Sequence, residues 1–286
     1  MNKLALLSSF IILQACAQKP WHGDLNYLGK FTNNLSEVSG IVSYNKKLAW
    51  VIEDNGNKDH IYAINLKAGL VKDLNVKDAK NQDWEDLATD KSGNLYIGDF
   101  GNNDNKRKDL TIYKLPNPEL EKGDKIPSEK ITFHYPEQKK FPPKKSNQVY
   151  DSEAFFHWDK HLYIFTKDRS RPYLGKTLIY QIPDKKGNYK AKLVGTINLC
   201  NDQDHCSVTG ADISNDGKTI ALIGYGYLYL GKNFDVTVIS ETKFDAIYLR
   251  HETQIESVCF LDDTTLLIAD EQSKTKGRNL YSYEFQ

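Results

Sequence analysis

Short runs of apolar residues, separated by turn residues, follow one another along the chain from about residue 24 onward. The stretch from Asp83 to Tyr113 shows the pattern most clearly. An apolar run from Trp84 is followed by a turn at residues 91–94, a second run at residues 95–98 and a third at residues 110–115. Runs of four to eight residues rich in β-branched and aromatic types, bounded by turn residues, are typical of antiparallel strands. The pattern therefore predicts an all-β chain.

The strand pattern repeats along the chain. Five strands open in a similar way, each with a polar residue ahead of an apolar run, at Ser39, Glu85, Glu153, Thr209 and Glu256. Four-stranded units of about 40–50 residues are the blades of β-propellers, and longer intervals leave room for loops. We therefore predict a five-bladed β-propeller. A six-bladed ring is the alternative, if one of the longer loops contains further strands.

The last repeat contains only three predicted strands, at residues 255–260, 265–269 and 280–285. A lone strand is predicted at residues 24–31, ahead of the first full repeat. Propellers leave only short, protected edges. The N-terminal strand is therefore expected to complete the last blade and close the ring, so that residues 23–286 form a single propeller domain.

The first residues have the character of an export signal. Lys3 precedes an apolar run from Leu4 to Leu13, which is too short to span a bilayer as a helix. The sequence Leu13-Gln14-Ala15-Cys16 is similar to a bacterial lipoprotein box. Residues 1–15 are therefore predicted to be a lipoprotein signal peptide, Cys16 the lipidated residue and residues 16–22 a tether. An ordinary cleaved secretory signal, with Cys16 incidental, is the alternative.

The signal indicates where the protein is expected to act, and the charge balance bears on its partners. The lipid anchor would hold it at the bacterial cell envelope, facing the periplasm or exposed at the surface, with the anchor as its contact with the membrane. The 38 Lys and Arg residues balance 38 Asp and Glu residues. A nucleic-acid-binding domain would be expected to be strongly basic. Nucleic acid is therefore not an expected partner, and we expect a monomer.

Cys200 and Cys206 lie six positions apart in a polar segment. An oxidising compartment outside the cytoplasm would allow them to form a disulfide. A metal site that includes His205 is the alternative, although the spacing is not C-x-x-C. Cys259 alternates with apolar neighbours in a predicted inner strand, and we expect a buried thiol there.

The opening residues of the five blades are candidate metal ligands. In a four-stranded meander, the start of the first strand and the end of the second lie at the same rim. Clustered carboxylates repel one another unless a cation lies among them, and Ca²⁺ accepts six to eight oxygen ligands. The sequence thus predicts an axial Ca²⁺ site, with Mg²⁺ as the alternative ion, formed by Ser39, Glu85, Glu153, Thr209 and Glu256. The competing interpretation is that acidic residues merely occupy turns. This explains Asp54 and Asp99 but not the three glutamates that begin apolar strands.

The first repeat, LSEVSGIVSYNKKLAWVIEDNG, resembles the opening blade of the calcium-activated apyrases. These are secreted five-bladed propellers that hydrolyse nucleoside di- and triphosphates. The likeness rests on Glu37-Val38-Ser39, on the acidic pair Glu53-Asp54 and on the later strand openings. It implies that the five opening residues form the calcium shell. The chain departs from the family in two places, because residues 224–227 (GYGY) replace an acidic loop and the acidic element before the first blade is missing.

Two functions follow from these residues. The first is a calcium-dependent hydrolase of phosphoanhydrides or phosphoesters, acting on a small phosphorylated substrate. In it, Asp54 or Asp99 is the general base, and Lys167, Arg169 or Arg171 stabilises the developing charge. The second is a calcium-braced binding module for an extracytoplasmic glycan, peptide or protein, in which the segment containing these cations is a solvated loop. A lactone hydrolase on a six-bladed ring would need a sixth strand opening, which the pattern lacks.

Overall fold

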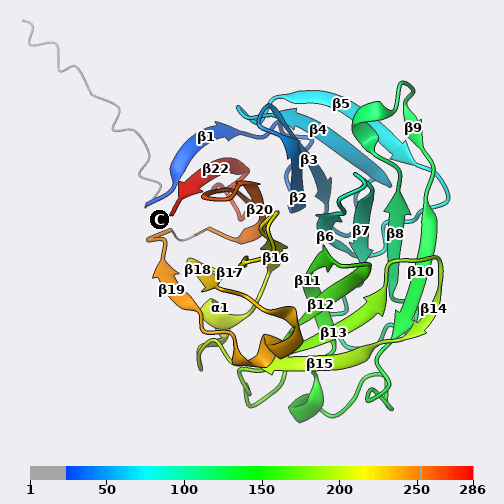
Figure 1. The fold of residues 1–286 in the computed structure, drawn as a ribbon, viewed down its shortest axis with the longest axis vertical. Coiled ribbons are helices and arrows are strands. Elements are labelled where there is room, and N and C mark those ends of the chain that lie inside the picture. Colours follow the sequence, from blue (N-terminus) through cyan, green and yellow to red (C-terminus); the bar gives the residue numbers. More distant parts are fainter. Residues whose placement is uncertain (1–23, 252, 286) are drawn as a thin grey trace, which may run out of the picture.

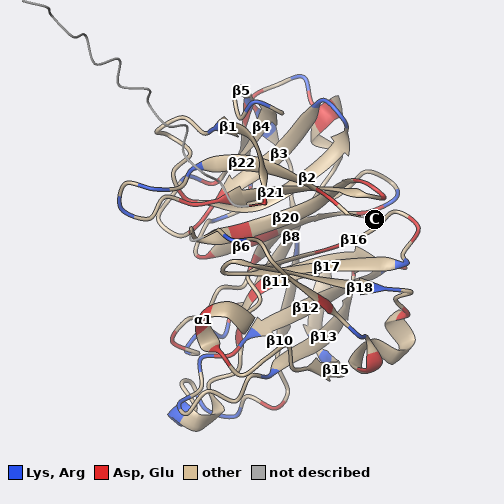
Figure 2. Ribbon diagram, turned by 90° about the vertical axis from the view of Figure 1, so that its left-hand side faces the viewer, with Lys and Arg blue, Asp and Glu red and all other residues tan. Residues whose placement is uncertain are grey.

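The computed structural model describes residues 24–251 and 253–285. Their strands form five separate sheets around a common axis (Figure 1). This confirms the predicted five-bladed β-propeller. All strands of the described residues belong to these five sheets, so they do not form a sixth blade. Figure 2 shows basic and acidic segments interspersed at both ends of the molecule, in keeping with the balanced composition.

The innermost strands of the five blades surround the axis, and the chain runs outward through each blade. Blade 1 comprises β2 (Val38–Asn45), β3 (Leu48–Glu53), β4 (His60–Asn65), β5 (Leu70–Val76) and β9 (Lys125–Ile126). Blade 2 comprises β6 (Trp84–Thr89), β7 (Leu95–Asp99), β8 (Thr111–Leu115), β10 (Glu129–His134) and β14 (Gly187–Lys190). Blade 3 comprises β11 (Asp151–Trp158), β12 (His161–Lys167), β13 (Thr177–Pro183) and β15 (Lys192–Ile197). Blade 4 comprises β16 (Gly210–Ile213), β17 (Thr219–Gly224), β18 (Tyr227–Lys232) and β19 (Asp245–Tyr248). Blade 5 comprises β20 (Ile255–Asp262), β21 (Thr265–Asp270), β22 (Asn279–Glu284) and β1 (Asn26–Lys30).

The N-terminal strand closes the ring. β1 pairs antiparallel with β22, with Asn26 opposite Ser282 and Lys30 opposite Asn279. The two lie side by side at the outer edge of blade 5 (Figure 1). The predicted completion of the last blade by the N-terminal strand is therefore confirmed.

Two short strands cross from one blade to the preceding one. β9 pairs in parallel with β5 of blade 1, although it lies within the chain segment of blade 2. β14 pairs in parallel with β10 of blade 2, although it lies within the segment of blade 3. β14 and β15 are therefore separate strands of different blades, and the chain changes blade at the buried Ala191 between them. These crossings tie adjacent blades together at their outer edges.

The hydrophobic core consists of five layers, each between two adjacent blades. Trp50 of blade 1 and Trp84 of blade 2, for example, belong to one layer, and both are at most 1% exposed. The layer between blades 5 and 1 combines residues such as Leu267 with Ile41. Five blades in a closed ring have five such interfaces, and the side chains of each strand alternate between the two interfaces that flank its blade. The ring is therefore closed by packing as well as by strand pairing.

The remaining elements are short and lie in connections. They are three 3₁₀ helices, at Pro118–Leu120, Lys145–Asn147 and Val236–Glu241, and one helical turn, α1 (Gln203–Cys206). Cys206 at the end of α1 forms a disulfide with Cys200, with the two Cα atoms 5.5 Å apart. Cys259 is a free, buried thiol. Among the described residues, no helix is long and apolar enough to cross a membrane. The predicted signal peptide, Cys16 and the tether lie outside the described residues.

Candidate functional site

All the predicted metal ligands occur at equivalent positions, at the head of an innermost strand. In β2 the pairing shifts between Val38 and Gly40, so Ser39 is an extra residue without a partner in β3. The same irregularity occurs at Glu85, Glu153 and Glu256 in their own strands. β-Bulges of this kind turn a side chain away from the regular alternation and are frequent beside active sites. In blade 4, Thr209 immediately precedes β16 and donates its N–H to Ile223.

Two of these five side chains join neighbouring blades. The Ser39 hydroxyl donates to the backbone carbonyl of Trp84 at 2.9 Å. The Thr209 hydroxyl donates to the backbone carbonyl of Ile255 at 2.8 Å. In each case the acceptor directly precedes the bulge residue of the next blade. Both hydroxyls therefore fix the spacing of adjacent strand heads.

The strongest candidate for a cation site lies between blades 1 and 2. Asp54, Asp83 and Glu85 each offer a carboxylate oxygen, and the three oxygens lie within 4.8 Å of one another. Asp54 follows β3, Asp83 precedes β6 and Glu85 is the bulge residue of β6. Gly101 allows this arrangement, because a Cβ atom there would lie 2.5 Å from the Asp83 carboxyl carbon and would also overlap Glu85. The loop backbone thus closes over the carboxylates as only a glycine permits.

The electrostatics of these three carboxylates are those of an uncompensated acidic group. Burial raises the pKa of Glu85 well above its usual range, and Glu153, Asp54 and Asp83 raise it further. Burial and the charges of Asp54 and Asp151 raise the pKa of Asp83 to about 7. No described residue donates a hydrogen bond to the Glu85 carboxylate. Mutual repulsion of this kind is relieved by protons or by a cation.

Glu153 has a different environment, because two cations of its own blade neutralise it. Lys167 at the end of β12 forms an ion pair with one of its oxygens, and Arg169 bonds the other at 2.6 Å. The Arg169 Nε also lies 2.7 Å from the carboxylate of the fully buried Asp151. These carboxylates hold the two cations in place beside the acidic group. The heads of the innermost strands lie at one end of the ring, which we call the mouth. This mouth has an acidic part in blades 1 and 2 and a basic part in blade 3.

The fifth opening residue, Glu256, is held by an aromatic residue from blade 4. The Tyr225 hydroxyl donates to Glu256 at 3.0 Å, and the Lys167 ammonium lies 3.4 Å from the same hydroxyl. Burial raises the pKa of Glu256 to about 8. Tyr225 belongs to the glycine- and tyrosine-rich segment at residues 224–227. This segment therefore contributes the Tyr225 hydroxyl, and no carboxylate, to the contacts of Glu256.

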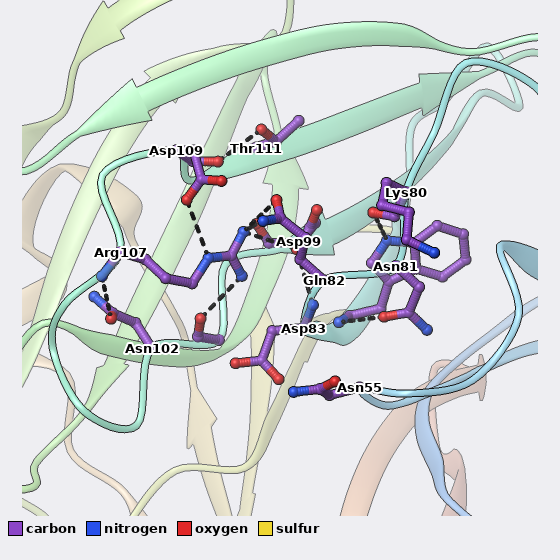
Figure 3. Close-up of polar contacts among 12 residues, drawn as sticks. Asn55, Lys80, Asn81, Gln82, Asp83, Asp99, Asn102, Arg107, Asp109 and Thr111 are labelled. Carbon is purple, nitrogen blue, oxygen red and sulfur yellow. Dashed lines mark hydrogen bonds and ion pairs between the residues drawn. The ribbon is translucent and has the colours of Figure 1, made fainter.

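The wall behind the acidic group is built on Arg107 (Figure 3). Its guanidinium lies 3.0 Å from the Asp99 carboxylate and 3.3 Å from Asp109, and it donates to the Gly101 carbonyl at 3.0 Å. Asp99 also accepts the Asp83 N–H at 3.1 Å. Arg107 therefore fixes both Gly101 and, through Asp99, the backbone of Asp83.

The loop after β7 is held by asparagine side chains. The side-chain oxygen of Asn102 accepts the backbone N–H of Arg107 at 2.8 Å. The backbone N–H of Asn102 donates to the Asp151 carboxylate at 2.7 Å. Asn105 accepts the backbone N–H of Tyr150 at 2.9 Å. Asp151 thus contacts this loop of blade 2 as well as Arg169 of its own blade. The acidic and basic parts of the mouth are linked through one buried carboxylate.

The predicted catalytic residues occupy different places. Asp54 is half-buried at the mouth, and Lys167 and Arg169 lie beside Glu153. Asp99 is fully buried against Arg107, and burial raises its pKa to about 6. Arg171 is exposed, and its backbone N–H donates to Lys145. The structure therefore brings Asp54, Lys167 and Arg169 to one mouth and places Asp99 and Arg171 apart from it.

Sequence reasoning missed Asp83 and Arg107. Asp83 stands two positions before Glu85, so the acidic spacing Asp-x-Glu at a strand head was the available signal. Arg107 lies in a lysine-rich loop, where nothing in the sequence distinguishes it from its neighbours.

Comparison with known proteins gives the fold and no family. No protein-family model matches the chain, and neither does any curated protein. The PQQ-bound aldose sugar dehydrogenase from Streptomyces coelicolor superposes with a TM-score of 0.53 at 10% identity, covering 93% of this chain and 99% of that one. A protein assigned to the gluconolactonases covers 93% of both chains with a TM-score of 0.48 at 11% identity. At such low identity the first likeness shows the fold alone. The chain is thus a β-propeller, and kinship with the apyrases is not shown.

Proposed function

We propose that the protein binds a divalent cation at Asp54, Asp83 and Glu85 and hydrolyses a small phosphorylated substrate at the same mouth. The observation that carries the proposal is the convergence of three carboxylate oxygens beside two ordered cations, Lys167 and Arg169. A set of carboxylate ligands is the chemistry that Ca²⁺ or Mg²⁺ prefers. The residues therefore fit the ion predicted from the sequence, although the ligand set is centred on blades 1 and 2 rather than on the axis.

The residues of blade 3 suit an anionic ligand. The Arg169 side chain is 29% exposed; its Nε bonds Asp151 and its Nη2 bonds Glu153 and Asn103, which leaves Nη1 for a ligand. Charge-assisted hydrogen bonds from a guanidinium to phosphate oxygens are strong, and the nearby ammonium of Lys167 adds positive charge at the same place. A cation bound to the carboxylates would supply Lewis-acid polarisation of a phosphoryl oxygen.

Asp54 is the better placed of the two predicted general bases. It is half-buried at the mouth, and burial together with Glu37 raises its pKa above the usual range. A base with a raised pKa accepts a proton more readily near neutral pH. Asp99 is fully buried, and one of its oxygens is taken up by the Arg107 guanidinium and the backbone N–H of Asp83. Because Asp54 is also a proposed ligand, we assign proton transfer to its oxygen that does not bind the cation, and a supporting role to Asp99.

The test is phosphate release from nucleotides and phosphoesters by metal-stripped protein, with and without added calcium. Calcium-dependent release is expected, and Arg169→Ala is expected to abolish most of it. Arg171→Ala is the matched control, because this exposed arginine lies two positions away and should leave the rate unchanged. If no substrate is turned over while calcium raises the melting temperature, the site is a metal-braced binding module for a glycan, peptide or protein.

The place of action is part of this proposal. Acylation at Cys16 would hold the propeller at the cell envelope, where calcium is available and nucleic acid is absent. Labelling with a radioactive fatty acid is expected in the wild-type protein and not in Cys16→Ser. A label that persists in the variant would contradict the lipoprotein prediction.

A further inference from the structure

The opposite mouth of the ring contains a large cavity that the proposed function does not use. Its volume is about 860 Å³. Each blade lines it with the far end of its innermost strand or the turn that follows, at residues 42–44, 89–93, 157–160, 212–215 and 259–261. Ligand sites are commonly concave, enclosed by several elements and equipped with a few convergent polar groups. The cavity meets the first two conditions, so the polar groups on its wall decide what it can bind.

Three metal-ligating side chains converge on one wall of this cavity. Asp90, His157 and Asp184 each offer a ligand atom, and the three atoms lie within 4.8 Å of one another. They come from the turn after β6, from β11 and from the residue after β13. The His157 Nε2 lies 2.9 Å from an Asp184 oxygen, and these side chains are only 10% and 12% exposed. Sequence analysis did not identify this group, because its members are 67 and 27 positions apart.

Surrounding residues fix the orientation of these side chains. One Asp90 oxygen accepts the N–H groups of Ser92 and Asn94, and the other accepts the Tyr96 hydroxyl at 2.9 Å. The His157 ring stacks on the Tyr96 ring, with the centroids 5.3 Å apart and the planes at 17°. Outer contacts that hold ligands in place are a regular feature of metal sites. Tyr96 therefore orients two of the three candidate ligands.

A buried hydroxyl on the same wall points independently to a missing ligand. Tyr44 lines the cavity, and its hydroxyl is buried without a hydrogen-bond partner among the described residues. It lines the same cavity as the three side chains and interacts electrostatically with Asp90. A buried hydroxyl without a partner is costly and calls for an explanation, such as a bound water or ligand.

We propose that Asp90, His157 and Asp184 form a second metal site, for a divalent ion of the zinc class, whose open coordination positions face the cavity. Imidazole is a preferred ligand of Zn²⁺ and related transition metals, whereas Ca²⁺ and Mg²⁺ prefer oxygen. Three protein ligands with a vacant fourth position are typical of zinc sites that bind a further small molecule. Here the cavity gives that molecule room beside Tyr44 and Trp158. The two mouths would thus hold different ions, and this proposal does not depend on the proposed function.

Zinc and cobalt titrations of the metal-stripped protein test the site. Calorimetry with Zn²⁺ should detect one tight site, and Co²⁺ at the same site should give the visible absorption of a low-coordinate nitrogen and oxygen complex. His157→Gln and Asp90→Asn should each weaken zinc binding by at least about tenfold, since even loss of an outer contact costs 10- to 100-fold. Thermal unfolding of both variants verifies that they are folded. If one variant does not fold, the other still tests the site.

Two controls separate this site from other ligands in the chain. His205→Gln removes an exposed histidine that is also paired with an aspartate, at 2.7 Å from Asp202, but belongs to no group of three candidate ligands among the described residues. Asp83→Asn removes a ligand at the other mouth. Both are expected to retain zinc binding. Equal zinc affinity in the wild type and His157→Gln, absence of a tight zinc site in the wild type, or loss of zinc binding in either control would overturn the proposal.

Discussion

At the scale of single residues, the mouth is organised by where each carboxylate finds compensating charge. Glu153 has Lys167 and Arg169 beside it, whereas burial and the charges of Glu153, Asp54, Asp83 and Asp151 all raise the pKa of Glu85. Two glutamates that occupy the same position in their blades therefore have different chemistry. The strand pattern predicted both positions but could not predict this difference, because it arises from side chains of other blades and loops.

The first prediction concerns Asp83. Since burial and neighbouring carboxylates raise its pKa to about 7, from about 4 in an unfolded chain, the folded protein binds more protons between these two values. The metal-free protein should therefore become more stable as the pH falls from about 8 to about 5. Glu271, whose pKa is also raised to about 7, and Glu256 act in the same direction. Melting temperatures measured across this range, with a chelator present, check the sign.

Asp83→Asn isolates the contribution of this residue. The variant should show a smaller gain in melting temperature on acidification, because one of the raised carboxyl groups is gone. Calcium should bind it at least about tenfold more weakly, a change of about 1.4 kcal/mol. Calcium should also raise the melting temperature of the wild type more at pH 8 than at pH 5, since protons and the cation compete for the same carboxylates. Equal effects at both pH values would contradict this account.

The second prediction concerns Gly101. Replacing it with alanine would place a methyl group against the carboxyls of Asp83 and Glu85, so these groups would have to separate. Calcium affinity should fall while the fold is retained, and calorimetry would measure the loss. Gly123→Ala is the control, because the nearest atom to its new Cβ would be 3.4 Å away, on the side chain of Glu121. If calcium affinity fell equally in both variants, the close approach at Gly101 would not be the cause.

At the scale of elements, the sequence was informative wherever one strand has a strong pattern of its own. The innermost strands combine an apolar run with a polar head, which was enough to locate all five blades. β9 and β14 have two and four residues and no such pattern. Their positions depend on pairing with a neighbouring blade, so sequence periodicity could not reveal them. The same holds for the group of Asp90, His157 and Asp184, whose members meet only once blades 2 and 3 are packed together.

The third prediction tests whether the crossing strand β9 contributes to stability. Ile126 is fully buried in the layer between blades 1 and 2. Ile126→Ala should lower the free energy of unfolding by about 2–5 kcal/mol, the usual cost of truncating a buried isoleucine. Leu120→Ala, in the same connection but 76% exposed, should change it by less than about 0.5 kcal/mol. Denaturant titration compares the two, and similar small effects would mean that β9 is dispensable.

At the scale of the whole molecule, closure of the ring holds the blades in fixed positions relative to one another, and with them the side chains at both mouths. Each mouth draws side chains from several blades, so a small rotation of one blade would separate ligands that come from its neighbour. The pairing of β1 with β22 and the layer between blades 5 and 1 join the two ends of the described chain into a ring. The number of predicted strands indicated this closure, since the last repeat had only three and a lone strand preceded the first repeat.

The last prediction removes that link. A chain that begins at Phe31 lacks β1 and with it the buried Leu25, and leaves the edge of β22 unpaired. Loss of the leucine alone should cost about 2–5 kcal/mol, which corresponds to roughly 4–20 °C in melting temperature for a domain of this size. The exposed strand edge should also promote association, because unpaired edges recruit other chains. A chain that begins at Asp24 is the control and should remain monomeric in size-exclusion chromatography. Both metal affinities should weaken together in the shortened chain, because the two mouths share one ring; if only stability fell, the blades would hold their sites without closure.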